Sequence, residues 1–200
     1  MIQTILYFHG FASSSESSKA QIIKKYISSN YKDIKIYTPN LSNDFKEAVE
    51  QIENLVKQNK NIAFMGCSLG GYYALYFSQL HRSKAILINP AIPPLEGFEI
   101  YLGENENFST REKFSITKKD IKYIRSISHD SFNNKERTLV LLESGDEVLD
   151  YIKTISYFRG SHIDILFGGN HSFSSFENKL VKIQEFLSLI HISEPTRHLL

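Results

Sequence analysis

Short apolar runs alternate with longer amphipathic stretches along most of the chain. Runs that end at glycine, proline or asparagine predict buried strands, and apolar residues three or four positions apart predict helices. The predicted strands are 5–8, 34–37, 61–66, 84–88, 138–142 and 163–167, and the predicted helices are 17–30, 44–58, 69–80, 149–158 and 176–187. This alternation predicts the α/β fold class, with a mostly parallel sheet and helices on both of its faces.

Residues 91–137 break the alternation. The segment contains Pro93-Pro94 and a polar Gly-Glu-Asn-Glu-Asn stretch at 103–107, and a helix is predicted over 117–128. We interpret the segment as a small insertion over the carboxyl ends of the strands, where ligands of such sheets bind. The alternative is an ordinary linker with one crossover helix.

Composition and charge narrow the class of protein. The chain has 200 residues, of which 42% are hydrophobic, and this suits one domain with a buried core. Its formal net charge of +1 argues against general nucleic-acid binding, which needs a basic surface. No apolar run reaches about 18 residues and no basic leader precedes the first one, so we expect a cytoplasmic protein without a membrane span. The single cysteine, Cys67, excludes an internal disulfide and a cysteine-rich zinc site.

Residues 66–70 read Gly-Cys-Ser-Leu-Gly and match the pattern G-x-S-x-G. The match alone is weak, but it lies between a predicted strand and a predicted helix, as a nucleophile elbow requires. In such a turn the flanking glycines avoid collisions, and the serine hydroxyl lies near a helix N-terminus that favours negative charge. We therefore take Ser68 as the candidate nucleophile. The alternative is a glycine-rich turn with an incidental serine.

A serine hydroxyl needs a base to take its proton, and this type of fold supplies an acidic residue and then a histidine further along the chain. Asp146 follows the predicted strand 138–142, and His171 follows the predicted strand 163–167. We expect His171 to act as general base and Asp146 to orient its imidazole. Asp150 is better explained as a surface or capping carboxylate, and Asp164 lies within a strand. Other histidines lack a glycine-rich loop and are weaker candidates: His81, His129 and His162.

An acyl-transfer site also needs N–H donors for the oxyanion of the tetrahedral intermediate. The backbone N–H of Leu69, directly after the candidate nucleophile, is the first that we expect. The loop after the first strand reads His9-Gly10-Phe11, and we expect the N–H of Phe11 to be the second donor. Gly10 would let this loop pass close to the substrate. We interpret His9 as a structural histidine that fixes the loop, not as a proton shuttle.

At these residues the sequence resembles the YqiA family of small bacterial esterases, which have the α/β-hydrolase fold. The resemblance runs from about residue 5 to about residue 187, and its most specific stretches are Tyr-Leu-Gly-Glu-Asn-Glu-Asn at 101–107 and Gly-Asp-Glu-Val-Leu-Asp-Tyr at 145–151. It implies a compact hydrolase without a large lid, active on acyl esters or thioesters. The family's Ser, Asp and His fall on Ser68, Asp146 and His171. Cys67 is a departure, because the family often has a small Ser-like residue there.

Residues 187–200 look foreign to the rest of the chain. The stretch Leu-Ser-Leu-Ile-His-Ile-Ser-Glu-Pro-Thr-Arg at 187–197 resembles the in-frame translation of a transposase adapter used in sequencing libraries. The alternative is the end of a last helix that is broken by Pro195. We expect a hydrolase domain over residues 1–186 and a non-native tail over 187–200 that carries no functional residue.

These features predict a serine carboxylesterase or thioesterase that acts on small-molecule substrates through an acyl-enzyme on Ser68, without a metal or cofactor. A peptidase or acyltransferase would use the same three residues. A hydrolase-fold binding protein without activity is an alternative from another class, and the intact set of Ser68, Asp146 and His171 argues against it. A nucleotide-binding domain is disfavoured, because the turn lacks the lysine of a phosphate-binding loop and the spacing of a dinucleotide fingerprint.

Overall fold

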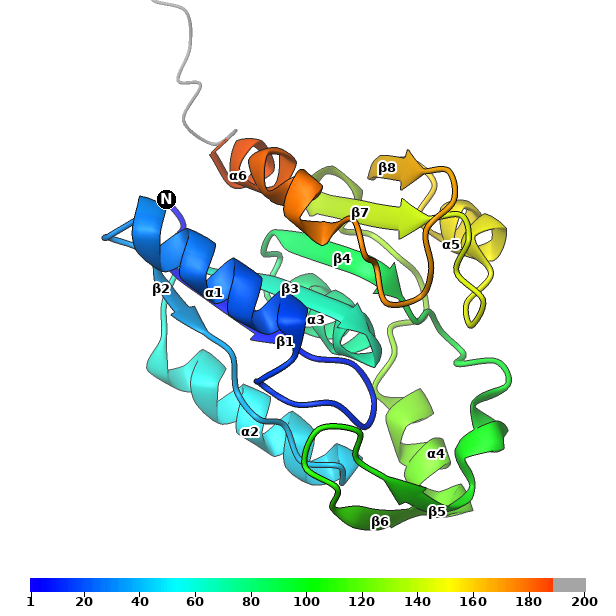
Figure 1. Ribbon diagram of the computed structural model, residues 1–200. Coiled ribbons are helices and arrows are strands. Elements are labelled where there is room, and N and C mark those ends of the chain that lie inside the picture. The colour runs from blue at the N-terminus through cyan, green and yellow to red at the C-terminus, as the bar shows by residue number, and fades with distance from the viewer. Residues whose placement is uncertain (189–200) are drawn as a thin grey trace, which may run out of the picture.

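The computed structural model describes residues 1–188 and contains a six-stranded parallel sheet (Figure 1). The strand order is β2-β1-β3-β4-β7-β8, and every neighbouring pair is parallel. The strands are β1 (Thr4–Phe8), β2 (Lys35–Tyr37), β3 (Ile62–Ser68), β4 (Ala85–Pro90), β7 (Thr138–Glu143) and β8 (His162–Leu166). All six predicted strands are present, and the predicted fold class is confirmed.

Helices cover both faces of the sheet. α1 (Ser18–Asn30) and α6 (Leu180–Ser188) lie on the face that is in front in Figure 1, and α2 (Phe45–Gln58), α3 (Leu69–Leu80) and α5 (Tyr151–Tyr157) lie on the other. Successive side chains of a strand point to opposite faces, so Leu6 and Phe8 pack toward α2 and α3, and Ile5 and Tyr7 pack toward α1 and α6. Because both faces are covered, the central strands are apolar without alternation.

Hydrogen-bonding side chains mark the starts of several helices. Asp44 accepts two hydrogen bonds from first-turn N–H groups of α2, and Asp150 does the same at the start of α5. Thr117 and Asp120 form a capping box at the start of α4 (Lys118–Ser126). The interpretation of Asp150 as a capping carboxylate is therefore confirmed.

The strand order places a crevice at one end of the sheet. β1 and β3 are neighbours, but the chain leaves β1 for α1 on one face and leaves β3 for α3 on the other. Connections that part in this way open a gap at the carboxyl ends of the two strands, which is where open α/β sheets bind ligands. The loop after β1 and the turn after β3 therefore meet at this end of the sheet, and residues of both line a small pocket there.

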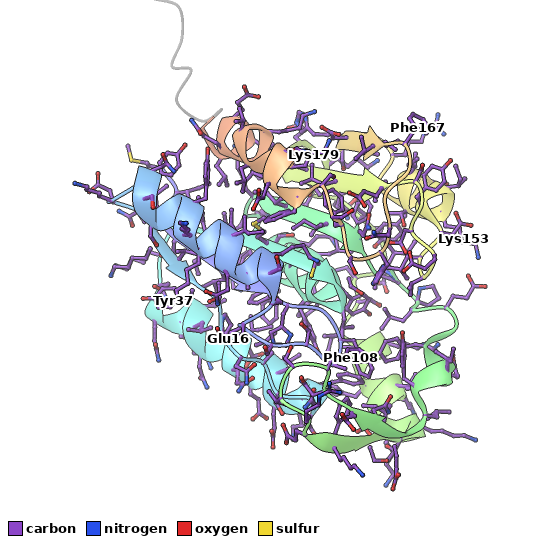
Figure 2. The ribbon with its side chains drawn as sticks, in the orientation of Figure 1. Glu16, Tyr37, Phe108, Lys153, Phe167 and Lys179 are labelled. Carbon is purple, nitrogen blue, oxygen red and sulfur yellow. The ribbon has the colours of Figure 1, made fainter. Side chains whose placement is uncertain are left out.

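The segment between β4 and β7 packs against the loop after β1. It contains an antiparallel hairpin, β5 (Gly103–Glu106) and β6 (Lys113–Ile116), followed by α4. The Asn107 side chain donates a hydrogen bond to the carbonyl oxygen of Ser13, and the N–H of Phe108 donates to that of Ala12, both at 2.8 Å. Phe108, labelled in Figure 2, lies on the connection between the two strands. These contacts hold the segment at the carboxyl end of β1.

The hydrophobic pattern does not predict the hairpin, and it does not predict the two short 3₁₀ helices of the same segment, Phe98–Tyr101 and Lys135–Arg137. β5 consists of Gly-Glu-Asn-Glu, which has neither alternating apolar residues nor β-branched residues. The strand forms because its partner strand and the loop after β1 supply contacts that lie outside its own sequence. The helix predicted over 117–128 is present as α4.

Asp164 joins the last strand to the last helix. Its carboxylate accepts a hydrogen bond from Lys179 at 2.7 Å and another from Lys182. Lys179, labelled in Figure 2, ends the 3₁₀ helix Phe176–Lys179 directly before α6. Burial alone would raise the pKa of Asp164, but the hydrogen bonds and charges of the two lysines outweigh it and lower that pKa.

Most of the predicted non-native tail, residues 189–200, lies outside the described residues. Within residues 1–188, no helix has the length and apolar character needed to cross a membrane.

We expect Asp164→Asn to lower the free energy of unfolding by about 1–2 kcal/mol at neutral pH, because it leaves the largely buried side chain of Lys179 and the exposed one of Lys182 without their carboxylate. Since folding lowers the pKa of Asp164, its contribution is present above the unfolded-state pKa of about 3.9 and is lost as the pH falls through the folded-state value. Urea denaturation of both proteins at about pH 7 and about pH 3 measures the effect. A difference in stability that stays the same at both pH values would contradict the assignment.

Candidate active site

Ser68 lies at the sharp turn where β3 ends and α3 begins. Its backbone has φ 52° and ψ −122°, a left-handed conformation that residues other than glycine rarely adopt. A Cβ atom at Gly66 would lie 2.1 Å from the carbonyl oxygen of Gly70, and one at Gly70 would lie 2.2 Å from that of Phe8. The turn closes only with glycine at both positions, which gives the G-x-S-x-G pattern its physical cause.

The structure brings Ser68, His171 and Asp146 together in one chain of contacts. Ser68 Oγ lies 3.1 Å from His171 Nε2, and His171 Nδ1 lies 2.9 Å from both carboxylate oxygens of Asp146. Because Nδ1 faces a carboxylate, we assign the proton of the neutral imidazole to Nδ1, which leaves Nε2 to accept the Ser68 hydroxyl proton. The side chain of His171 is 22% exposed and that of Asp146 only 2%, so the imidazole is open to solvent and the carboxylate is not.

Asp146 is fixed by its own turn as well as by His171. Its Oδ1 accepts hydrogen bonds from the N–H groups of Val148 and Leu149, both at 2.8 Å. The other acidic candidates have different partners, since Asp150 caps α5 and Asp164 binds two lysines. Asp146 is therefore the carboxylate that the fold directs at the histidine.

The loop after β1 lies against Ser68. A Cβ atom at Gly10 would lie 3.4 Å from Ser68 Cβ, an ordinary contact distance. His9 is buried, its Nε2 accepts a hydrogen bond from the N–H of Leu41 at 3.0 Å, and its Nδ1 lies 2.9 Å from the carbonyl oxygen of Gly10. Burial lowers the pKa of His9, and the contact with Gly10 offsets this only in part. Both ring nitrogens are engaged, which agrees with a structural histidine.

Two backbone N–H groups border this region and have no hydrogen-bond acceptor among residues 1–188. Leu69 is the first residue of α3, so its N–H has no acceptor within the helix. Among residues 1–188, no backbone carbonyl accepts a hydrogen bond from the N–H of Phe11. Phe11 and Leu69 line the same small pocket between the loop after β1 and the start of α3. The two N–H groups expected to bind an oxyanion are therefore free to donate.

The side chain of Phe11 is held by the segment between β4 and β7. Its ring centroid lies 4.5 Å from that of Tyr101 and 5.6 Å from those of Phe98 and Phe114. Phe45, at the start of α2, has its ring centroid 6.5 Å from that of Phe11 and 5.8 Å from that of Phe98. Aromatic pairs at such distances contribute about 0.5–1.5 kcal/mol each beyond their buried area. The segment between β4 and β7 therefore supports the loop that carries one of the expected oxyanion donors.

The sequence pattern does not single out three polar residues that contact the loop of His171. Glu147 accepts a hydrogen bond from the backbone N–H of His171 at 2.8 Å. Asn89 and Glu143 are buried at the ends of β4 and β7 and contact residues next to the histidine. In the sequence, Asn89 and Glu143 could have been recognised only because each is a polar residue at the end of an otherwise apolar strand.

A cavity of about 790 Å³ lies at the opposite end of the sheet from Ser68. Its lining includes His81, His162, Arg82, Lys84 and Arg137. α2 and α3 end beside it, so the basic side chains complement the negative ends of the two helix dipoles. His81 and His162 are thereby removed from the candidate site, as their sequence context indicates.

The family model described as "Uncharacterised protein family (UPF0227)" matches residues 4–188. The chain belongs to this family. A UPF0227 protein of Vibrio parahaemolyticus is 25% identical over 187 residues, which are 91% of this chain and 98% of the relative. YcfP of Escherichia coli, another UPF0227 protein, is 23% identical over 190 residues, 92% of this chain and 99% of YcfP. The predicted family resemblance is confirmed, although the UPF0227 description itself names no activity.

Solved structures similar to the UPF0227 chain establish its fold as that of the α/β hydrolases. Est1E from Butyrivibrio proteoclasticus with ferulic acid bound has a TM-score of 0.70 at 16% identity and covers 96% of this chain and 90% of its own. A monoacylglycerol lipase from Paleococcus ferrophilus has a TM-score of 0.68 at 14% identity, over 92% of this chain and 93% of the lipase. Mouse alpha/beta hydrolase domain-containing protein 10 has a TM-score of 0.67 at 15% identity, over 94% and 90%.

We expect Gly66→Ala to lower the free energy of unfolding by about 3 kcal/mol or more, because the new Cβ would overlap backbone atoms that cannot move aside. Gly10→Ala is the matched control for stability, since its Cβ would reach only ordinary contact distance. Urea denaturation followed by circular dichroism compares the two variants with the wild type. A Gly66→Ala protein as stable as Gly10→Ala would contradict the steric account of the elbow.

The lowered pKa of His9 predicts a loss of stability on mild acidification. As the pH falls below the unfolded-state pKa of about 6.5, His9 becomes protonated in the unfolded chain but stays neutral in the folded protein. The free energy of unfolding therefore decreases. Glutamine keeps an acceptor near the position of Nε2 but does not titrate. We therefore expect His9→Gln to lose less stability than the wild type between about pH 7.5 and about pH 5, measured by urea denaturation. Equal losses in the two proteins would disprove this role for His9.

Proposed function

We propose that this UPF0227 protein is a serine hydrolase that cleaves carboxylic esters or thioesters of small molecules through an acyl-enzyme on Ser68. The observation that carries the proposal is the contact chain from Ser68 Oγ to His171 Nε2 and from His171 Nδ1 to Asp146. An incidental serine in a glycine-rich turn would require neither a histidine in hydrogen-bond contact nor a buried carboxylate behind that histidine. A cytoplasmic location and a single hydrolase domain over residues 1–186 remain predictions.

In the first step Ser68 Oγ attacks the acyl carbon of the substrate while His171 Nε2 takes the hydroxyl proton. As the new C–O bond forms, the carbonyl electron pair moves to the oxygen, and the N–H groups of Phe11 and Leu69 donate to the resulting oxyanion. Asp146 stabilises the imidazolium through its Nδ1–H. When the carbonyl reforms, the bond to the alcohol or thiol group breaks, and His171 returns the proton to that leaving group.

In the second step water attacks the acyl-enzyme, with His171 again accepting a proton. The second tetrahedral intermediate collapses to a carboxylic acid, and Ser68 recovers its proton from the imidazolium. The sum of both steps is one ester and one water converted into one acid and one alcohol, or thiol for a thioester. No electrons are gained or lost and the serine carries the acyl group, so the route requires neither a metal nor a cofactor.

The same acyl-enzyme would serve a peptidase or an acyltransferase, which differ only in the leaving group or the acceptor. Esters are favoured as the substrate class by two of the structural neighbours. Est1E has ferulic acid bound, and the lipase from Paleococcus ferrophilus is named for monoacylglycerols. A hydrolase-fold binding protein without activity is the second candidate, and an assay for an activated serine separates it from the first.

We expect a fluorophosphonate probe to label the wild type and not Ser68→Ala, because only a serine activated by a neighbouring base reacts readily with it. Turnover of p-nitrophenyl butyrate should fall in Ser68→Ala by a factor of about 10⁴ or more, as loss of a triad member does elsewhere. Ser131→Ala is the matched control, since Ser131 is an exposed serine outside the site. It should label and turn over substrate as the wild type does.

Equal labelling of Ser68→Ala and the wild type would refute Ser68 as the nucleophile. A folded wild type that neither labels nor turns over ester would instead favour the binding-protein candidate. Circular dichroism of each preparation establishes that the sample is folded before either conclusion is drawn.

A further inference from the structure

Beneath the loop that carries His171 lies a carboxylate that the proposed reaction does not use. Glu143 is the last residue of β7, and it is 0% exposed. Burying a carboxylate away from water costs free energy unless hydrogen-bond donors replace the water around its oxygens. The identity of those donors therefore shows what this buried residue does.

Residues 170–175 supply the donors on both sides of His171. Glu143 Oε2 accepts a hydrogen bond from the backbone N–H of Asn170 at 2.7 Å. Glu143 Oε1 accepts two from Ser175, one from the N–H at 3.0 Å and one from the hydroxyl at 2.5 Å. Asn170 directly precedes His171 and Ser175 follows it by four residues. One carboxylate therefore clamps the loop before and after the histidine.

Asn89 ties the same loop to a second strand. It ends the apolar part of β4, is 3% exposed, and has a left-handed backbone with φ 38°. Its Nδ2 donates to the carbonyl oxygens of Asn170 at 3.1 Å and His171 at 3.4 Å, and its Oδ1 accepts a hydrogen bond from the N–H of Glu143 at 2.9 Å. The two buried side chains therefore connect β4, β7 and the loop in one network.

The glycine before Asn170 allows the carboxylate to reach the backbone. A Cβ atom at Gly169 would lie 2.0 Å from Glu143 Oε2, and the residue has φ +75°. Any side chain at this position would displace the carboxylate and strain the backbone. The second glycine of the Gly-Gly-Asn-His stretch is thus explained by its contact with Glu143, in addition to its place in a turn.

Hydrogen bonding keeps Glu143 ionised. Burial alone would raise its pKa, but the hydrogen bonds from the Ser175 hydroxyl and from the N–H groups of Asn170, Ser175 and Ser174 outweigh it and lower that pKa. The loop thus closes around a charged acceptor, and hydrogen bonds to charged groups are stronger than those between neutral ones.

We infer that Glu143 is a positioning residue, whose carboxylate, together with Asn89, holds residues 168–175 so that His171 Nε2 stays in contact with Ser68 Oγ. Glu143 is not placed among the reacting groups and acts only through the loop. Its kinetic consequence rests on the proposed function, whereas the anchoring of the loop does not. A displacement of about 1 Å in such a site can lower the rate by a factor of about 10².

Glu143→Gln tests the inference in the full chain. The amide keeps the shape of the side chain but replaces one acceptor oxygen with an NH₂ group, which must face N–H donors on one side of the clamp. We expect kcat for p-nitrophenyl butyrate to fall by about 10- to 100-fold with KM nearly unchanged, because substrate binding does not involve Glu143. Hydrogen exchange of the segment 168–176 should become faster, with the rest of the protein as protected as in the wild type.

Two further variants make the test specific. Ser175→Ala removes only the hydroxyl donor, so a drop in kcat of a few-fold is expected together with faster exchange in the same segment. Asn59→Ala removes a hydrogen bond of 2.8 Å to the carbonyl oxygen of Leu55 at the end of α2 that is remote from the site, and it should lower stability by about 1 kcal/mol. It should leave kcat and the exchange of residues 168–176 unchanged, which separates mispositioning from a general loss of stability.

A lower kcat with faster local exchange in Glu143→Gln supports the inference. A wild-type kcat in that variant overturns it, whatever the exchange shows. If Glu143→Gln does not fold, Ser175→Ala decides, and an unchanged kcat with faster exchange overturns the inference. A folded wild type without hydrolytic activity counts against the proposed function instead. In that case hydrogen exchange alone tests the anchoring role: if residues 168–176 exchange in Glu143→Gln as slowly as in the wild type, the anchoring role is overturned.

Discussion

The geometry of the site depends on a turn that has no space for a side chain at Gly66 and Gly70, two residues before and two residues after Ser68. The carbonyl oxygens of Gly70 and Phe8 lie where Cβ atoms of Gly66 and Gly70 would stand. The chain can pass directly from β3 into α3 only by placing Ser68 in a left-handed conformation. The register between β3 and β4 shifts at the same point. The hydroxyl is thereby directed into the crevice at the end of the sheet, near the first N–H groups of α3.

Every other part of the site comes from the carboxyl end of another parallel strand. β1 leads into the loop of Phe11, β7 leads into the turn of Asp146, and β8 leads into the loop of His171. Loops at this edge cannot be fixed by an apolar core alone, and buried polar side chains hold them instead. His9 binds the backbone of Leu41, and Glu143 binds the backbone around His171. The aromatic side chains packed on Phe11 extend the same support to the first loop.

The sequence predicts those parts of the fold and of the site that depend on short-range patterns along the chain. Hydrophobic runs predict the six strands and the flanking helices, and glycine spacing predicts the elbow at Ser68. Chain order and position in loops after strands select Asp146 and His171. The hairpin β5–β6 and the anchors Asn89 and Glu143 do not follow, because they depend on contacts between segments that are distant in the chain. Glu143 was visible only as a polar residue at the end of an apolar run.

The most direct test of the central claim is to look for the covalent intermediate. Rapid mixing with p-nitrophenyl acetate, acid quenching during turnover and mass spectrometry of the peptides would locate any acyl group. The account predicts one acetyl group per chain, attached to Ser68, which disappears as the substrate is exhausted. Turnover by folded protein with no acyl group on Ser68, or with the acyl group on another residue, would contradict it.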